Sequence, residues 1–213
     1  MSGKMRLGIL VSGRGTNLQS ILDGCSAGII PASVAVVVSN RPGVLALDRA
    51  KVAGVPAVTV NHKEYGKWPE SKPHYEADLV QALKDHGAEL VVCAGYDRLA
   101  GDTLMQAFPG RIINVHPALL PSFPGLHAQR DALEYGVKVS GATVFFVDPT
   151  TDGGPVIIQE AVPVAEDDTE ETLSKRILEA EHRILPAAIT LIASGRVRLE
   201  GRRVRIVTQE ATS

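Results

Sequence analysis

Residues 112–125 read Ile-Ile-Asn-Val-His-Pro-Ala-Leu-Leu-Pro-Ser-Phe-Pro-Gly, and the rest of the chain is organised around them. The apolar start predicts a buried strand over 111–115. Three prolines then follow, and each fixes φ and removes a backbone donor. The stretch therefore predicts a rigid loop at the end of a strand, where functional residues are often placed.

Asn114 and His116 are two residues apart in this predicted strand. Side chains at that spacing lie on one face of a strand. The Asn114 amide can donate to a developing oxyanion, and the His116 imidazole can also exchange a proton near neutral pH. The pair is a candidate for acyl-transfer chemistry. The alternative is a histidine that only caps a loop and an asparagine that only closes a turn.

The composition is that of an ordinary globular protein. The chain has 213 residues, 45% of them hydrophobic and 22% charged, with a formal net charge of −2. This length suits one large α/β domain or two small domains. The charge gives no global field for nucleic acid or an anionic membrane, so we expect neither as a partner.

Targeting and metal signals are also missing from the sequence. It shows no signal-peptide pattern and no run of about 18 apolar residues, so we expect a cytoplasmic protein without a membrane span. The two cysteines, Cys25 and Cys93, are not linked by metal-ligand spacing. We expect both to be reduced and expect no metal site.

A glycine-rich turn follows the first expected strand, over 6–11. It reads Ser-Gly-Arg-Gly-Thr-Asn at 12–17, and apolar residues at helical spacing start at Leu18. Such a turn directs backbone N–H groups and a helix dipole at an anion. It is not a Walker A loop, since no Gly-Lys-Ser/Thr ends it, and Leu18 replaces the third glycine of a dinucleotide fingerprint. We predict a site for one phosphate group, with an empty tight turn as the alternative.

Strands and helices are expected to alternate up to the central stretch. Expected strands are 33–38, 57–60 and 89–94, and expected helices are 44–53, 73–86 and 102–108, with a polar mobile loop over 61–72. This order favours a parallel sheet with right-handed crossovers and ligands at the carboxyl ends of its strands. The glycine-rich turn, the loop 95–100 and the central stretch share that edge, so we expect the active site there.

The second half is expected to extend the sheet with antiparallel strands. It comprises a helix at 127–135, strands at 137–147 and 156–164 that pair antiparallel, a long helix at 168–192 and a hairpin of 197–199 and 204–207. We expect Asp168 to cap the long helix with Glu171 as its capping-box partner, and Pro186 to kink it.

Asp152 is the third catalytic candidate and lies in an Asp-Gly-Gly-Pro loop. Two glycines allow close backbone approach or positive φ. If the loop folds back beside His116, the carboxylate would favour imidazolium and orient the ring. The alternative is a simple hairpin turn.

Three motifs of the chain resemble those of the folate-dependent formyltransferases. They are the Asn-x-His and Leu-Leu-Pro segment at 114–121, Phe-Pro-Gly at 123–125 and Asp-Gly-Gly-Pro at 152–155. Within that superfamily the chain is most similar to the glycinamide ribonucleotide formyltransferases, through the loop at 12–17 and Glu181 in the last helix. The resemblance extends over about residues 6–199.

The resemblance implies an α/β, Rossmann-like formyltransferase fold: a mostly parallel sheet flanked by helices, with an antiparallel C-terminal extension. Residues 1–213 would form a single catalytic domain, with a phosphate-binding half at about 6–110 and a folate-binding and catalytic half at about 111–207. The implied reaction transfers a formyl group from 10-formyltetrahydrofolate, as co-substrate, to the amine of glycinamide ribonucleotide in purine synthesis.

The resemblance also assigns residues by position. Asn114, His116 and Asp152 would be catalytic. Gly15, Thr16 and Asn17 would hold the phosphate, and Glu181 would bind the sugar or glycinamide end. The folate would be bound by Lys72, Asp97, Arg98, Leu99, Ala100, Asn114, Asp148 and Asp152.

The chain departs from the family pattern at two positions. Phe145 stands where some members have a histidine, and Asp97 replaces an apolar residue beside the folate pocket. The alternative readings are a 10-formyltetrahydrofolate hydrolase, which usually carries an extra N-terminal domain, and a non-catalytic nucleotide- or folate-binding module. The oligomeric state stays open, a homodimer included.

Overall fold

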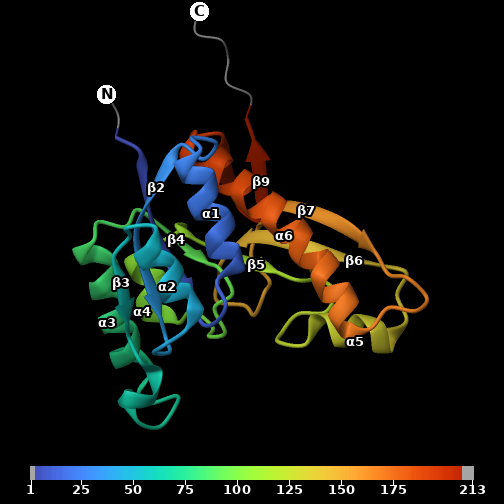
Figure 1. The fold of residues 1–213 in the computed structure, drawn as a ribbon, viewed down its shortest axis with the longest axis horizontal. Helices are drawn as coiled ribbons and strands as arrows, with labels where there is room; N and C mark the ends of the chain where they lie inside the picture. The colour runs from blue at the N-terminus through green and yellow to red at the C-terminus, as the bar shows by residue number, and fades with distance from the viewer. Residues whose placement is uncertain (1–2, 208–213) are drawn as a thin grey trace, which may run out of the picture.

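A seven-stranded sheet forms the centre of the computed structural model, which describes residues 3–207 (Figure 1). The strands are β1 (Met5–Val11), β2 (Ala32–Ser39), β3 (Ala57–Thr59), β4 (Leu90–Cys93), β5 (Ile112–His116), β6 (Val139–Phe146) and β7 (Val156–Pro163). Their order is β3-β2-β1-β4-β5-β6-β7. The first five are parallel, whereas β6 and β7 pair antiparallel, which confirms the predicted fold class.

Helices cover both faces of the sheet. They are α1 (Thr16–Ser26), α2 (Leu45–Val52), α3 (Lys72–Asp85), α4 (Asp102–Ala107), α5 (Ala128–Tyr135) and α6 (Glu170–Ala193). Helices α1, α2 and α6 pack on the face that buries Ile9, and α3 and α4 on the face that buries its neighbour Leu10. Figure 1 shows α1 and α6 side by side across the sheet.

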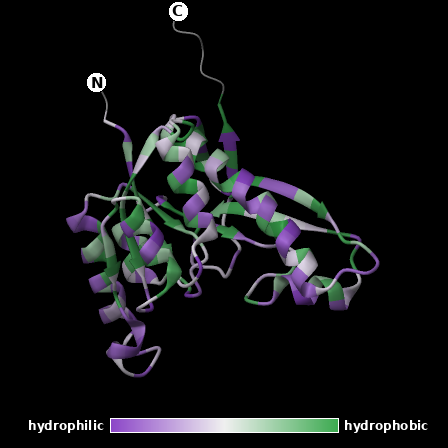
Figure 2. Cartoon of the chain, viewed as in Figure 1, coloured by the Kyte–Doolittle hydropathy of each residue, from purple (hydrophilic) through white to green (hydrophobic). Residues whose placement is uncertain are grey.

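The burial of each strand follows its place in the sheet. All of β4 is buried, as its continuous apolar sequence predicts for a central strand covered on both faces. In β7, at the edge, buried and exposed residues largely alternate. Figure 2 shows the same division, with hydrophobic residues concentrated on the inner strands and hydrophilic residues on the outward faces of the helices. Within residues 3–207, no helix has the length and apolar character to cross a membrane.

The expected loop over 61–72 contains more structure than its polar sequence predicts. A short 3₁₀ helix, η1 (His62–Tyr65), is capped by the Asn61 side chain, which accepts a hydrogen bond from the Lys63 N–H at 3.2 Å. A hydrophobic repeat cannot reveal such a helix, because a single turn is too short to show a repeat. A local hydrogen bond from one side chain is enough to stabilise it. Further along, a separate two-stranded sheet of β8 (Val197–Glu200) and β9 (Arg203–Ile206) confirms the expected hairpin.

The cap predicted for the long helix is wrong by one residue. Thr169 is the N-cap and Thr172 its capping-box partner, because each hydroxyl accepts the other residue's backbone N–H. Asp168 instead forms a two-point ion pair with Arg176 at 2.8 and 2.9 Å. The helix is continuous through Pro186, which lies inside it.

We expect Thr169→Ala to lower the free energy of unfolding by about 1 kcal/mol, as for other lost N-caps. Glu171→Ala, which removes the predicted but unused partner, should cost less than about half of that. Urea unfolding of both variants measures the difference. Equal losses would contradict the assignment of the cap to Thr169.

Candidate active site

Two adjoining cavities open at the carboxyl ends of the parallel strands. The larger, of about 650 Å³, is lined by Asn17, Lys72, Asp97, Arg98, Leu99, Asn114, His116, Asp152 and Glu181 from the predicted site. The smaller, of about 320 Å³, is lined by several of these and adds Ala100 and Asp148. Gly15 and Thr16 line neither cavity but precede Asn17 directly in the chain. The structure thus brings the predicted site residues to one edge of the sheet.

His116 is the last residue of β5, and its buried side chain is held from two sides. Its Nε2 lies 2.8 Å from the carbonyl oxygen of Phe123. Its Nδ1 lies 3.5 Å from Oδ2 of Asp152. Because a carbonyl oxygen only accepts, Nε2 must carry a hydrogen, and Nδ1 is the nitrogen left for exchange with a substrate. The contact that spacing could not show, between Asp152 and His116, is therefore present.

Asn114 lies one pleat away on the same strand and lines both cavities. The prediction that Asn114 and His116 share a face of the strand is therefore confirmed. On the neighbouring strand β6, Phe145 pairs with Asn114 in the register and is 2% exposed. An apolar ring at this position cannot transfer a proton, so any proton transfer beside Asn114 must involve other groups.

The predicted phosphate loop ends at Gly15, which has a φ of +71° and caps α1. Its Cβ, if it had one, would lie 2.7 Å from the Cβ of Ala46, so both the backbone angle and the space require glycine. Glycine supplies no side-chain cap, and the first-turn N–H groups of α1 stay available to an anion. The geometry therefore suits a phosphate group.

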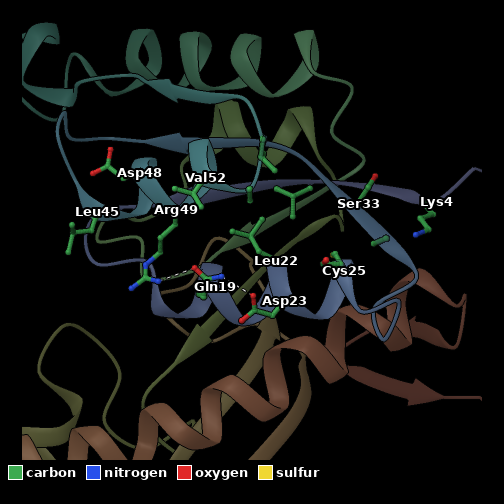
Figure 3. A pocket seen from close by; sticks show the side chains of 15 residues that line it. Lys4, Gln19, Leu22, Asp23, Cys25, Ser33, Leu45, Asp48, Arg49 and Val52 are labelled. Atoms are coloured by element: carbon green, nitrogen blue, oxygen red, sulfur yellow. Dashed lines mark hydrogen bonds between the residues drawn. The ribbon is translucent and has the colours of Figure 1, made fainter.

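Helix α2 supports the phosphate loop from behind. The Ala46 N–H donates to the carbonyl oxygen of Gly13 at 3.1 Å. Arg49 donates from Nε to the carbonyl oxygen of Arg14 and from Nη1 to Oε1 of Gln19, both at 2.9 Å. Figure 3 shows Arg49 reaching Gln19 across the groove between α1 and α2. The main-chain carbonyls of Gly13 and Arg14 are thus both held by hydrogen bonds from α2.

Glu181 projects from α6 into the larger cavity and is 7% exposed. Burial raises the pKa of Glu181 from its ordinary value of 4.5 to about 7, although the hydrogen bond from the Asn17 amide, at 2.8 Å, lowers it. The Oδ1 of Asn17 has no hydrogen-bond partner in the described part of the chain. Beside the phosphate loop, the cavity therefore offers a carboxyl group that ionises near neutral pH.

Residues 5–189 match the family described as formyl transferase. The chain belongs to the formyl transferase family. Phosphoribosylglycinamide formyltransferase from Escherichia coli is 37% identical over 195 residues, which cover 92% of this chain and 90% of that protein. The crystal structure of glycinamide ribonucleotide transformylase 1 from Symbiobacterium toebii has a TM-score of 0.93 and 52% identity, and the match covers 98% of this chain and 96% of that one.

Some relatives are much longer than this formyl transferase. The trifunctional purine biosynthetic protein adenosine-3 of Drosophila melanogaster is 43% identical over 194 residues. That match covers 90% of this chain and 14% of the trifunctional protein. The chain thus spans about a seventh of that relative's length.

Trp68 lines the candidate active site and was missed by the sequence analysis. Its ring lies beneath two cations, with the Arg98 guanidinium 5.2 Å and the Lys72 Nζ 5.9 Å from the ring centroid. The ring and Lys72 both line the larger cavity. The signal in the sequence was the single tryptophan of the chain, in a polar segment where no core requires it.

Asp97, which the resemblance assigns to folate binding, has its carboxylate engaged by other residues of the protein. It lines the larger cavity, but its carboxylate is bound by Ser12, Asn40 and Arg41 on the phosphate-loop side. In the smaller cavity, the Asp148 carboxylate accepts hydrogen bonds from the N–H and hydroxyl of Thr150, which shape the loop after β6. Within residues 3–207, no group of three or more His, Cys, Asp or Glu side chains is arranged to hold a metal ion.

The raised pKa of Glu181 predicts a pH-dependent stability. Between pH 4.5 and about 7 the folded protein binds more protons at this site than the unfolded chain, so its ionisation destabilises the fold as pH rises. Glu181→Gln removes that penalty. We expect its free energy of unfolding to match the wild type near pH 4 and to exceed it by up to about 3 kcal/mol near pH 8.

Denaturant unfolding across this pH range measures the effect, with Glu179→Gln, exposed on the same helix, as the matched control. A difference between Glu181→Gln and wild type that stays constant with pH would contradict the raised pKa.

Proposed function

We propose that this formyl transferase moves a formyl group from 10-formyltetrahydrofolate to the amine of glycinamide ribonucleotide, releasing tetrahydrofolate and formylglycinamide ribonucleotide. One observation carries the proposal. Asn114, His116 and Asp152 line a single cavity together with Asn17, in the uncapped first turn of α1, and this cavity adjoins the smaller one that Ala100 and Asp148 line.

The ribonucleotide would bind on the side of α1. Gly15, Thr16 and Asn17 would hold its phosphate through the uncapped first turn. Glu181, hydrogen-bonded to Asn17, would bind the sugar or the glycinamide end. The preference of hydroxyl and amine donors for an ionised carboxylate favours this orientation, since Glu181 ionises near pH 7.

The reduced folate would bind on the side of the β4 and β6 loops. Its contacts would come from Lys72, Arg98, Leu99, Ala100, Asn114, Asp148 and Asp152, which line the two cavities. Asp97, which lines the larger cavity, would border the folate as well, although its carboxylate is bound by Ser12 and Asn40. Residues 6–110 would then contribute most of the phosphate site and residues 111–207 the catalytic groups, within one catalytic domain.

In the proposed reaction the substrate amine attacks the formyl carbon directly, and no protein nucleophile is needed. A bond forms between this nitrogen and carbon, and the carbonyl electrons move to an oxyanion that the Asn114 amide and the His116 Nδ1–H stabilise. The bond to the folate nitrogen then breaks. Asp152, 3.5 Å from Nδ1, would orient the His116 ring and help a water carry the proton from the attacking nitrogen to the folate nitrogen.

Absorbance of the folate product, followed with and without glycinamide ribonucleotide, tests the function. Product that forms only with the ribonucleotide supports the proposal. Equal product without it would mean that water is the acceptor and that the protein is a hydrolase. Binding of both ligands with no product in either mixture would indicate a non-catalytic module.

We expect Asn114→Ala and His116→Ala each to lower turnover by about 10²- to 10³-fold, because each removes a donor to the oxyanion. Both residues lie apart from the phosphate loop. The Kd for ribose 5-phosphate, measured by calorimetry, should therefore stay within about twofold of wild type. His74→Ala, on the exposed face of α3, serves as the control. Near-wild-type turnover in both site variants would rule out the assigned roles.

A further inference from the structure

The Asp97 carboxylate joins the ends of three neighbouring strands. Its Oδ1 accepts hydrogen bonds from the Ser12 hydroxyl at 2.8 Å and from the Asn40 amide at 2.7 Å. Its Oδ2 forms an ion pair with Arg41. Ser12 follows β1, Asn40 and Arg41 follow β2, and Asp97 lies in the loop after β4, so this hub spans the order β2-β1-β4.

Ser12 is locked to the loop after β4 by main-chain contacts as well. Its N–H donates to the carbonyl oxygen of Gly95 at 3.0 Å, and its hydroxyl accepts the Asp97 N–H at 3.0 Å. Ser12 begins the phosphate loop, and Arg98, directly after Asp97, lines both cavities. Asp97 therefore links the two halves of the site through its backbone N–H and its carboxylate.

The contacts around Asp97 favour its ionised carboxylate over the neutral carboxylic acid. Burial raises the pKa of Asp97, but the hydrogen bonds from Asn40 and Ser12 and the charges of Arg41 and Arg98 outweigh it, so the pKa lies below its ordinary value. Hydrogen bonds to a charged group are stronger than those between neutral groups. An apolar residue at this position would leave the amide and the guanidinium without this partner.

We propose that Asp97 is a positioning residue that couples the phosphate loop to the folate-side loop, so that a ligand in one half of the site favours binding in the other. The proposal rests on the proposed function for the identity of the two ligands. Asp97 acts through Ser12 and through the backbone of the 98–100 segment, and it takes no part in the chemical step. Coupling of this kind is reciprocal between the two ligands.

The test measures the Kd for ribose 5-phosphate by calorimetry, with and without saturating tetrahydrofolate under anaerobic conditions. In the wild type we expect tetrahydrofolate to tighten ribose 5-phosphate binding by about fivefold or more. In Asp97→Asn we expect this factor to fall below about twofold, and the Kd for ribose 5-phosphate alone to rise about tenfold.

Ser12→Ala is the second variant, because it breaks the same link without changing a charge. It should lose the coupling as well, and the double variant should lose no more than either single variant. Asp131→Asn, which removes a surface carboxylate 3.6 Å from Arg130, is the matched control and should keep the wild-type factor. Thermal unfolding of each variant fixes a temperature at which all are folded.

A wild-type coupling factor that persists in Asp97→Asn, or a factor near one in the wild type, would overturn the positioning role. These results are separate from the turnover assay. Coupled binding without formylation of glycinamide ribonucleotide would reject the proposed function and support the positioning role. Normal formylation with unchanged coupling in the variants would reject only the positioning role. Failure of the wild type to bind either probe would overturn both.

Discussion

A single carboxylate oxygen, Oδ2 of Asp152, holds together two loops that line the candidate active site beside His116. It accepts the Gly125 N–H at 2.8 Å and lies 3.5 Å from the His116 Nδ1. Its side chain is 10% exposed, and its backbone has a φ of +49°, which is rare for a residue other than glycine. A buried carboxylate in such a conformation persists where its surroundings hold it, so these contacts and the fold of both loops depend on one another.

The sheet places one partner of this contact, and the loop after β6 supplies the other. The parallel strands β1, β4 and β5 end at one edge, where the phosphate loop, the Asp97 loop and the proline-rich loop therefore meet. Strand β6 runs antiparallel beside β5, with Thr143 opposite His116 and Phe146 opposite Ile113, so β6 ends beside the start of β5. The loop after Phe146 must therefore fold back toward the carboxyl end of β5 for Asp152 to reach His116, which lies 36 positions earlier in the chain.

Local patterns in the sequence predicted the elements well, because burial dictates them. The continuous apolar run of β4 and the strand-turn-helix around Gly15 are examples, and the shared face of Asn114 and His116 followed from the two-residue period of a strand. The N-cap at Thr169 was missed because Asp168 and Thr169 are adjacent and both are residue types that favour the N-cap position. The choice between them was made by Arg176, which engages Asp168.

Contacts between distant segments could not be predicted in this way. Asn17 and Glu181 are hydrogen-bonded across 164 positions, and Asp97 and Ser12 across 85. No periodicity or spacing connects such pairs, so Glu181 was assigned by resemblance alone and the Asp97 hub was not foreseen. Trp68 was missed for the same reason, since the fold brings Lys72 and Arg98 to its ring.

The central claim is that His116 and Asp152 act as one unit in formyl transfer, and a double-mutant cycle on turnover tests it most directly. The cycle compares His116→Ala, Asp152→Asn and the double variant under saturating 10-formyltetrahydrofolate and glycinamide ribonucleotide. If the carboxylate works through the imidazole, the double variant should be about as slow as His116→Ala alone. Losses that multiply in the double variant would contradict the account, because the two groups would then act independently.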